Sequence, residues 1–296
     1  MNFSLRRISG FPRDGVGVIC CWLSIIIALS GLCMIIFTTI NKGLPDFTIN
    51  FLVDDPSDAG RSGGIGPIIV STIIILFISL IVAVPMGIST ALLLSEAQNR
   101  FPFLVRIISI SLDILAGVPS IVFGLFGSIF FAQYMGMGVS LYSGGFTLAF
   151  MILPYFIRIV EQGLAAIPNE VRLGIACLTL SRTIAVFGIL LPMIVPSIIL
   201  GIVLSLARAA SETAALLFTS GYIDRMPSSL SDSGRTLSVH IYDLAMNVAG
   251  GDSASYRSAL VLLAFLFFIF QVSHFLSRWY SSKFTGGNSG NFMAYG

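Results

Sequence analysis

The sequence predicts an all-α integral membrane protein with six transmembrane helices. Of its 296 residues, 56% are hydrophobic and 10% are charged, whereas a soluble domain carries about 25% charged residues. Long uncharged runs dominate over short alternating ones, which is typical of membrane helices rather than of a β-barrel. The net charge of +2 comes from scattered basic residues without a patch, so no nucleic acid is expected as a partner.

Charge-free stretches locate the six spans. The first is retained rather than cleaved as a signal peptide, because its apolar core is long and no A-x-A site follows it. The third span begins near residue 106, is interrupted by Asp113, and is followed by a short loop at about 133–144. The remaining spans are expected at 15–41, at 66–95, from that loop to residue 157, at 185–218 and at 258–277.

Lysine and arginine in the loops predict the orientation. The side that carries both termini has the larger set, which places the termini in the cytoplasm and the protein in the bacterial inner membrane. The outer segments 42–65 and 219–256 are rich in Asp, Ser and Gly, and are either a docking surface or plain solvated loops. The basic residues of the inner side are Arg6, Arg7, Arg13, Arg100, Arg106, Arg158, Arg172, Arg182, Arg278 and Lys283, against Lys42, Arg61, Arg225, Arg235 and Arg257 outside.

Arg208 and Glu212 stand inside the fifth apolar stretch. A charge at membrane depth costs about 2.5–3.5 kcal/mol on insertion scales, so it usually marks a partner or a permeation path. Two residues four apart on a helix lie on the same face, which predicts that this arginine and this acid form a pair.

The segment 161–184 between spans four and five contains a helix start at Pro168 and Asn169, because proline suits the first turn and asparagine can cap it. Val171, Ile175, Leu178 and Arg182 follow at helical spacing. We therefore expect a short amphipathic helix that rests on the lipid interface or enters a groove of a partner.

This segment resembles the EAA loop of the permease subunits of ABC importers, and more closely that of the PstA-type phosphate permeases. The positions that match in place are Ile167, Pro168, Arg172, Leu178, Ser181, Arg182, Leu191 and Pro192. The sequence departs at the positions that name the motif, where the family Glu is Leu173, the two Ala are Gly174 and Ile175, and the Gly is Thr179. Glu170 is a candidate substitute for the missing acid.

Four further stretches, at 63–72, 84–96, 115–127 and 207–216, are similar to the same family, and 115–127 is the most specific. The resemblance covers residues 15–280. It implies the MetI-like fold of type I ABC importer permeases, with a cytoplasmic N-terminus at 1–14, a permease domain at 15–280 and a cytoplasmic tail at 281–296. Within the coupling segment it implies contacts to an ATPase through Pro168, Glu170, Arg172, Leu178, Ser181 and Arg182.

The resemblance implies a permease of an ATP-driven phosphate importer. Its partners would be a PstC-type second permease, a PstB-type ATPase dimer, a PstS-type periplasmic phosphate-binding protein, phosphate and membrane lipid. The alternatives are a permease for molybdate or sulfate and a permease with weakened ATPase coupling. A standalone membrane enzyme or sensor would need a catalytic cluster or a sizeable cytoplasmic domain, and the sequence contains neither.

Catalytic groups and metal ligands are not expected in this chain. No glycine precedes Lys42 or Lys283, so a Walker A phosphate loop is absent, and ATP and magnesium would bind the partner ATPase. The four cysteines lie in or beside apolar segments without a metal-ligand spacing, and we expect small buried hydrophobes there. They are Cys20, Cys21, Cys33 and Cys177.

The expected substrate path centres on Arg208, whose guanidinium can bind an anion, with Glu212 neutralising it when substrate is absent. The alternative is a structural ion pair. Gly201, Ser205, Ala209 and Ala215 form a stripe of small residues that either packs against a neighbouring helix, the favoured role, or lines the path with Ser205.

Proline and glycine predict where the spans bend. Gly117, Pro119 and Ser120 indicate a helix break, with the Ser120 hydroxyl available to the freed backbone or to the path. Pro85 and Pro192 predict similar kinks in spans two and five. Asp113 would face the cavity, cap the half-helix after Pro119 or pair with an arginine of the partner permease, and a packing or partner contact is favoured.

Overall fold

The computed structural model describes residues 13–45, 47–98 and 100–284, most of which are helical. The greater part of both predicted cytoplasmic ends, with Arg6 and Arg7, lies outside the described residues. The α-helices are α1 (Arg13–Gly43), α2 (Gly66–Ala97), α3 (Pro102–Ala116), α4 (Ser120–Gly127), α5 (Leu141–Ala165), α6 (Asn169–Cys177), α7 (Arg182–Ile184), α8 (Leu191–Met193), α9 (Val195–Ala210), α10 (Ala214–Thr219), α11 (Leu237–Met246) and α12 (Asp252–Phe284).

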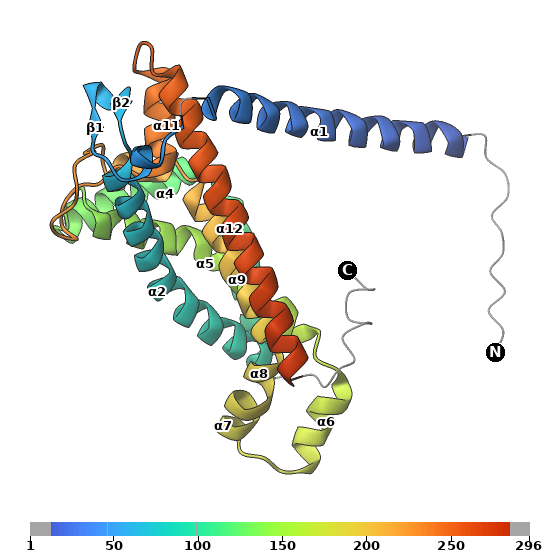
Figure 1. Cartoon of the computed structure of the whole chain (residues 1–296). Coiled ribbons are helices and arrows are strands. Elements are labelled where there is room, and N and C mark those ends of the chain that lie inside the picture. The colour runs from blue at the N-terminus through green and yellow to red at the C-terminus, as the bar shows by residue number, and fades with distance from the viewer. Residues whose placement is uncertain (1–12, 46, 99, 285–296) are drawn as a thin grey trace.

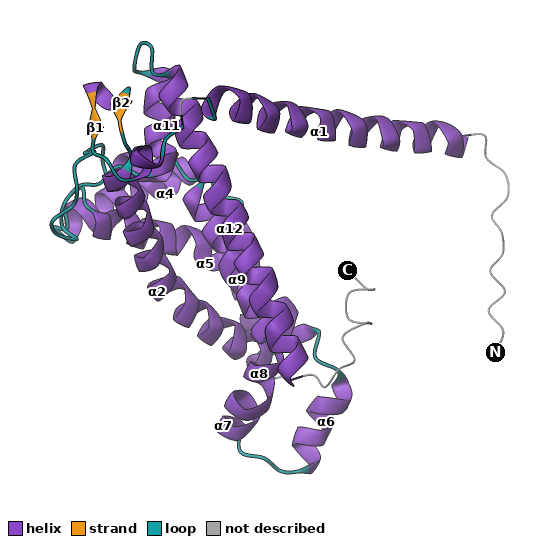
Figure 2. Cartoon of the chain, in the orientation of Figure 1, coloured by secondary structure: helices purple, strands orange, loops and turns teal. Residues whose placement is uncertain are grey.

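Shorter elements complete the fold (Figure 2). Strands β1 (Pro56–Ser57) and β2 (Ser62–Gly63) form an antiparallel pair in which Pro56 faces Gly63. Two 3-10 turns span Ile49–Leu52 and Asp58–Gly60, and two π-helical turns span Ser128–Tyr134 and Ala185–Leu190.

Four helices of the described chain are long and apolar enough to cross a membrane: α1, α2, α5 and α12. Two further pairs pass the same test together but are bent, α3 with α4 by 98° and the α7–α8 segment with α9 by 62°. Counting each bent pair as one span gives up to six. This mostly helical arrangement agrees with the predicted number of spans and with their order along the chain.

Helix α5 lies at the centre of the bundle, with α2 and α9 packed against it. Its Phe156 is fully buried between two glycines, Gly87 of α2 and Gly201 of α9. A Cβ at Gly201 would lie 3.0 Å from the Phe156 ring, so small residues let these helices approach closely. Gly201, Ser205 and Ala209 of the stripe on α9 are all buried. The stripe therefore packs against neighbouring helices, which is the role favoured from the sequence.

The two bent spans differ in how well they were predicted. The break between α3 and α4 falls at Gly117–Pro119, as predicted, with Pro119 preceding the first residue of α4. The kink predicted at Pro192 in the fifth span is confirmed by the bend of 62° near Ile194, whereas a second break at residues 211–213 was not predicted. Pro192 lies beside the first of these breaks. Helix α2 continues through Pro85 without ending, and the kink predicted at this proline stays a prediction.

Helix α1 extends away from the rest of the chain and meets it only near its last turn (Figure 1). There Lys42 lies 4.8 Å from the centre of the Tyr256 ring on α12, and Gly43 abuts the Tyr256 backbone. Large apolar side chains such as Trp22 and Met34 are exposed along α1. The described part of the chain therefore leaves most of the apolar surface of α1 uncovered.

Figure 1 shows α11 and the strands at one end of α12, and α6 and α7 at the other. At the α11 end, Arg235 forms an ion pair with Asp243 at 3.1 Å, and both side chains are largely buried. His240 is fully buried beside them. Its burial, with a smaller effect of the Arg235 charge, lowers its pKa to about 4, while Asp243 acts in the opposite direction.

Candidate functional site

Arg208 lies in the last turn of α9, and Glu212 lies in the break before α10. The predicted pairing on one helix face is therefore wrong, because the helix ends at Ala210 and the chain turns at Ser211. The Ser211 hydroxyl donates to the Ala207 carbonyl at 2.9 Å, so the end of the helix is satisfied locally. The two charges still interact through space, but no ion pair of the described residues joins them.

The Arg208 guanidinium contacts an aromatic ring instead of a carboxylate. Its central carbon lies 5.8 Å from the centre of the Tyr155 ring on α5, which is within the range of a cation–π contact. Arg208 is half-buried and takes part in no ion pair among the described residues. Its positive charge is thus held in place by a neutral neighbour and keeps its hydrogen-bond donors for another partner.

Glu212 connects three parts of the chain. Its carboxylate lies close enough to the Ser120 side chain, at the first residue of α4, for the two to interact. Its backbone carbonyl accepts a hydrogen bond from the Ser238 hydroxyl of α11. Two residues that the sequence places far apart in the chain, Ser120 and Glu212, therefore meet where two broken spans face each other.

Close packing of α4 against α10 holds the two breaks together. A Cβ added at Gly124 would lie 2.8 Å from the Ala215 Cα, so the backbones of the two short helices touch. Gly124 belongs to the stretch 115–127 that the sequence marks as most specific. Its lack of a side chain positions Ser120 beside Glu212.

Ser205, the fourth residue expected on the path, is fully buried, and its hydroxyl has no hydrogen-bond partner among the described residues. It lies one helical turn before Arg208 on α9. The structure therefore groups Arg208, Glu212 and Ser120 around two helix breaks and places Ser205 inside the helix packing.

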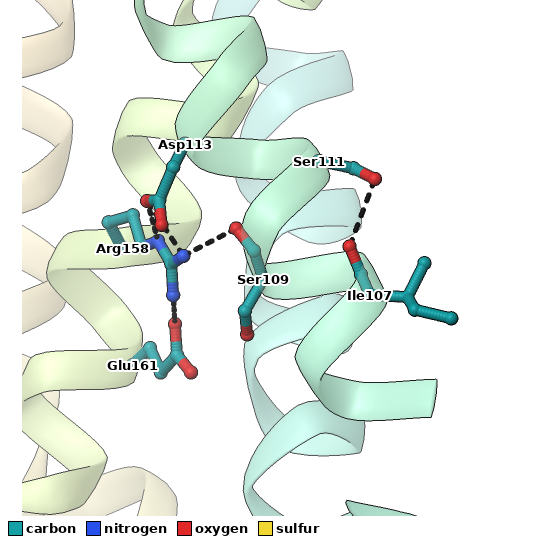
Figure 3. A network of polar contacts seen from close by, with 6 residues as sticks. All are labelled: Ile107, Ser109, Ser111, Asp113, Arg158 and Glu161. Atoms are coloured by element: carbon teal, nitrogen blue, oxygen red, sulfur yellow. Dashed lines mark hydrogen bonds and ion pairs between the residues drawn. The ribbon is translucent and has the colours of Figure 1, made fainter. Parts of the chain in front are cut away.

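A second group of charges lies between α3 and α5 (Figure 3). Arg158 binds Asp113 at 2.7 Å, Glu161 at 2.7 Å and the Ser109 carbonyl at 2.6 Å. Asp113 therefore pairs with an arginine of its own chain, whereas the arginine expected from the sequence was one of the partner permease. Sequence reasoning counted Arg158 only as a loop charge and missed the network, although its spacing of three residues from Glu161 indicated a pair.

The coupling segment 161–184 forms two short helices rather than one. Val171 and Ile175 pack on the bundle, whereas α6 ends at Cys177, Leu178 is exposed and Arg182 starts α7. The expected Asn169 cap is absent, because Pro168 holds the cap position without a side-chain hydrogen bond.

Three other residues of the coupling segment have clear local roles. Ser181 caps α7 by accepting from the Ile184 amide at 3.4 Å. Arg172 donates to the Leu164 carbonyl at 2.8 Å and so ties α6 to the end of α5. Thr179 adopts a φ of +46°, a left-handed conformation that favours the glycine found there in the family that the sequence resembles.

Metal ligands are not clustered in the described part of the chain, where no group of three His, Cys, Asp or Glu residues could hold an ion. The cysteines were expected to be buried, and this is wrong. All four are free and exposed: Cys20, Cys21, Cys33 and Cys177.

The fold and the site define a polytopic membrane protein with a charged centre at paired helix breaks and a small helical segment at one end. Residues 83–284 match the family described as binding-protein-dependent transport system inner membrane component. This match covers more than half of the chain, and the protein belongs to that family.

Individual relatives agree with this assignment. The chain is 28% identical over 256 residues to the probable ABC transporter permease protein YqgI of Bacillus subtilis, covering 76% of this chain and 86% of that protein. It is 31% identical over 200 residues to the phosphate transport system permease protein PstA of Pasteurella multocida, covering 67% and 70%. It is also 30% identical over 234 residues to the PstC permease of Xylella fastidiosa, covering 71% and 70%.

A solved structure supports the fold. The inward-facing MetNI methionine ABC transporter contains a chain that matches with a TM-score of 0.56 at 17% identity, covering 71% of this chain and 91% of that one. At this identity the likeness concerns the fold alone, and it confirms the predicted MetI-like architecture.

Proposed function

We propose that this chain is a permease subunit of an ATP-driven phosphate importer. The observation that carries the proposal is the half-buried Arg208, which lies at two paired helix breaks without a carboxylate partner among the described residues. A guanidinium binds phosphate oxygens through two parallel hydrogen bonds and stays charged at every physiological pH. The relatives named as phosphate permeases support the choice of anion.

Glu212 and Ser120 suit phosphate better than other oxyanions. Phosphate carries a P–OH group at neutral pH. A carboxylate beside the anion can accept a hydrogen bond from this hydroxyl group. Sulfate and molybdate carry no such hydroxyl group at neutral pH. They would therefore place an unprotonated oxygen against the Glu212 carboxylate, without a hydrogen bond to offset the like charges. The Ser120 hydroxyl can donate to the anion or to Glu212. This chemistry separates phosphate from the alternative of a molybdate or sulfate permease.

The proposed transport cycle needs other subunits. A second permease of the PstC type would complete the path, a phosphate-binding protein would deliver the anion to the α11 end, and an ATPase dimer would bind the α6–α7 end. In this arrangement both termini are cytoplasmic, ATP and magnesium bind the ATPase, and this chain performs no catalysis. Breaks at membrane depth suit alternating access, because unwound backbone lines a path in many transporters.

The test is uptake of labelled phosphate by vesicles that contain the complete importer. Arg208→Gln is expected to abolish ATP-dependent uptake while the complex remains assembled, and Arg100→Gln, a change of an exposed arginine, is expected to leave uptake near the wild-type level. Normal uptake by Arg208→Gln would refute the assignment of the site. Faster uptake of sulfate or molybdate than of phosphate by the wild type would refute the choice of anion.

A further inference from the structure

The coupling helix α6 has one face fixed to the bundle. Val171 and Ile175, one turn apart, pack on the buried cluster that contains Leu164 and Ile167. Arg172 is half-buried, and its guanidinium is bound to the Leu164 carbonyl. The only basic side chain of α6 is therefore directed to the backbone of the same chain.

The opposite face of α6 is apolar and uncovered by the described residues. Leu173 is 65% exposed, and Leu178, just after the helix, is 67% exposed. Gly174, Ala176 and Cys177 between them are also exposed. Leu173 and Cys177 are four residues apart, so they stand on one helix face. We call Leu173, Cys177 and Leu178 the apolar ridge.

The charges around the apolar ridge favour a protein groove over a lipid surface. A helix that lies on a membrane typically surrounds its apolar face with Lys and Arg, which attract anionic lipid. In α6 the exposed charge is the acid Glu170, in the first turn, and the arginine is directed inward. Figure 1 shows α6 beyond the ends of α2 and α12. A short helix with apolar residues at this spacing is the form that enters a groove of a partner protein.

We propose that the apolar ridge enters a groove of the ATPase subunit that is itself apolar and carries no cation opposite Leu173. This inference rests on the proposed function and adds the chemistry of the partner. An acid at position 173, as in the family that the sequence resembles, would need a cation in the groove, and that cation would be buried unpaired against Leu173 at a large cost. An ATPase whose groove carries a cation for the acidic motif should therefore bind this chain poorly.

The experiment uses the complete importer, purified through a tag on this chain, with the retained ATPase and its ATP hydrolysis as readouts. Leu173→Glu is expected to lower ATPase retention at least about tenfold, the equivalent of about 1.4 kcal/mol, whereas Leu173→Met keeps it. The matched control Asn169→Glu adds the same charge to the first residue of α6, away from the apolar ridge, and is expected to retain the ATPase. Equal or better retention by Leu173→Glu would show a cation in the groove and overturn the inference, while the proposed function would stand. A wild-type chain that retains no ATPase would overturn both.

A fluorescent variant separates protein from lipid as the occupant. Leu173→Trp is placed in vesicles of phosphatidylethanolamine and phosphatidylglycerol, with the emission of the two native tryptophans subtracted through the wild type. Before the ATPase is added, brominated acyl chains are expected not to quench the emission of this tryptophan. Adding the ATPase is then expected to shift the emission to shorter wavelength. Quenching by brominated lipid that the ATPase does not relieve would place the apolar ridge in the membrane and overturn the inference.

Discussion

The guanidinium of Arg158 on α5 lies 2.7 Å from the carboxylate of Asp113 on α3. The same guanidinium also binds Glu161 and the Ser109 carbonyl, so Arg158 serves two acids and one backbone group. Asp113 is 66% exposed at its side chain, whereas Arg158 is 24% exposed. Arg158 is therefore the centre of the network, because each of its three partners contacts this arginine.

This asymmetry predicts an order of stabilities. Arg158→Leu leaves Asp113 and Glu161 without a cation, and should cost about 2–3 kcal/mol. Asp113→Asn leaves Arg158 bound to Glu161 and to Ser109, and should cost less than about 1 kcal/mol because Asp113 is the exposed partner and Arg158 keeps its other contacts. Thermal unfolding of the purified protein in detergent measures the difference. Equal losses for the two variants would contradict the central role of Arg158.

Gly124 should be intolerant of even one methyl group. A Cβ there meets the Ala215 backbone, which cannot move aside as a side chain tip can, so Gly124→Ala should separate α4 from α10. We expect a loss of about 1–3 kcal/mol and a large loss of phosphate uptake, because Ser120 moves away from Glu212.

The matched control for this change is Gly31→Ala in α1, where an added Cβ meets nothing within 4 Å. Alanine is favoured over glycine inside a helix by about 0.5–1 kcal/mol, so this variant should be slightly more stable and fully active. If Gly124→Ala transports phosphate as well as Gly31→Ala, the contact between the two short helices does not position the site.

Replacing Thr179 with glycine should stabilise the loop between α6 and α7. Its φ of +46° costs an L-residue about 1–2 kcal/mol, and threonine is β-branched, which adds to the strain. Thr179→Gly is expected to slow amide hydrogen exchange across residues 169–184, since the loop between α6 and α7 no longer opposes the packed geometry. Leu178→Gly, at a position with a φ of −79°, should give no such protection. Faster exchange in Thr179→Gly would mean that the threonine side chain stabilises the loop.

The sequence predicted the spans and the bends at Pro119 and Pro192 because these depend on local chemistry. The length of an apolar run decides whether it can cross a membrane, and Pro119 removes a backbone donor directly after Gly117 and Val118, where the helix ends. The break at residues 211–213 contains Ser211, Glu212 and Thr213 without proline or glycine. No proline or glycine ends a helix at these residues, and the sequence therefore predicted no break there.

The site residues were found as chemical types, but their partners were not. The contact of Ser120 with Glu212 depends on how two broken spans pack, and the bond from Ser238 to the Glu212 carbonyl depends on how α11 folds back. The pairing of Asp113 with Arg158 likewise joins two helices whose relative rotation the sequence does not contain. Only the i, i+3 pair of Arg158 and Glu161 was accessible from spacing.

His240 predicts how acid affects the α11 end. It is fully buried with Arg235 and Asp243 as its charged neighbours, and its Nε2 has no hydrogen-bond partner in the described residues. Burial lowers its pKa from 6.5 to about 4, so between these values the unfolded chain binds more protons than the folded one. Stability therefore falls as the pH decreases from about 6.5 to about 4, and the full loss is roughly 3 kcal/mol.

The measurement is hydrogen exchange of α11, combined with the melting temperature, from pH 7.5 down to pH 4.5. His240→Gln stays neutral and should lose less stability than the wild type over this range, although the substitution itself lowers stability at pH 7.5. His274→Gln removes an exposed histidine and should follow the wild-type curve. If His240→Gln and wild type lose stability in parallel, then His240 titrates equally in the folded and unfolded chain, and the acid sensitivity belongs to other groups.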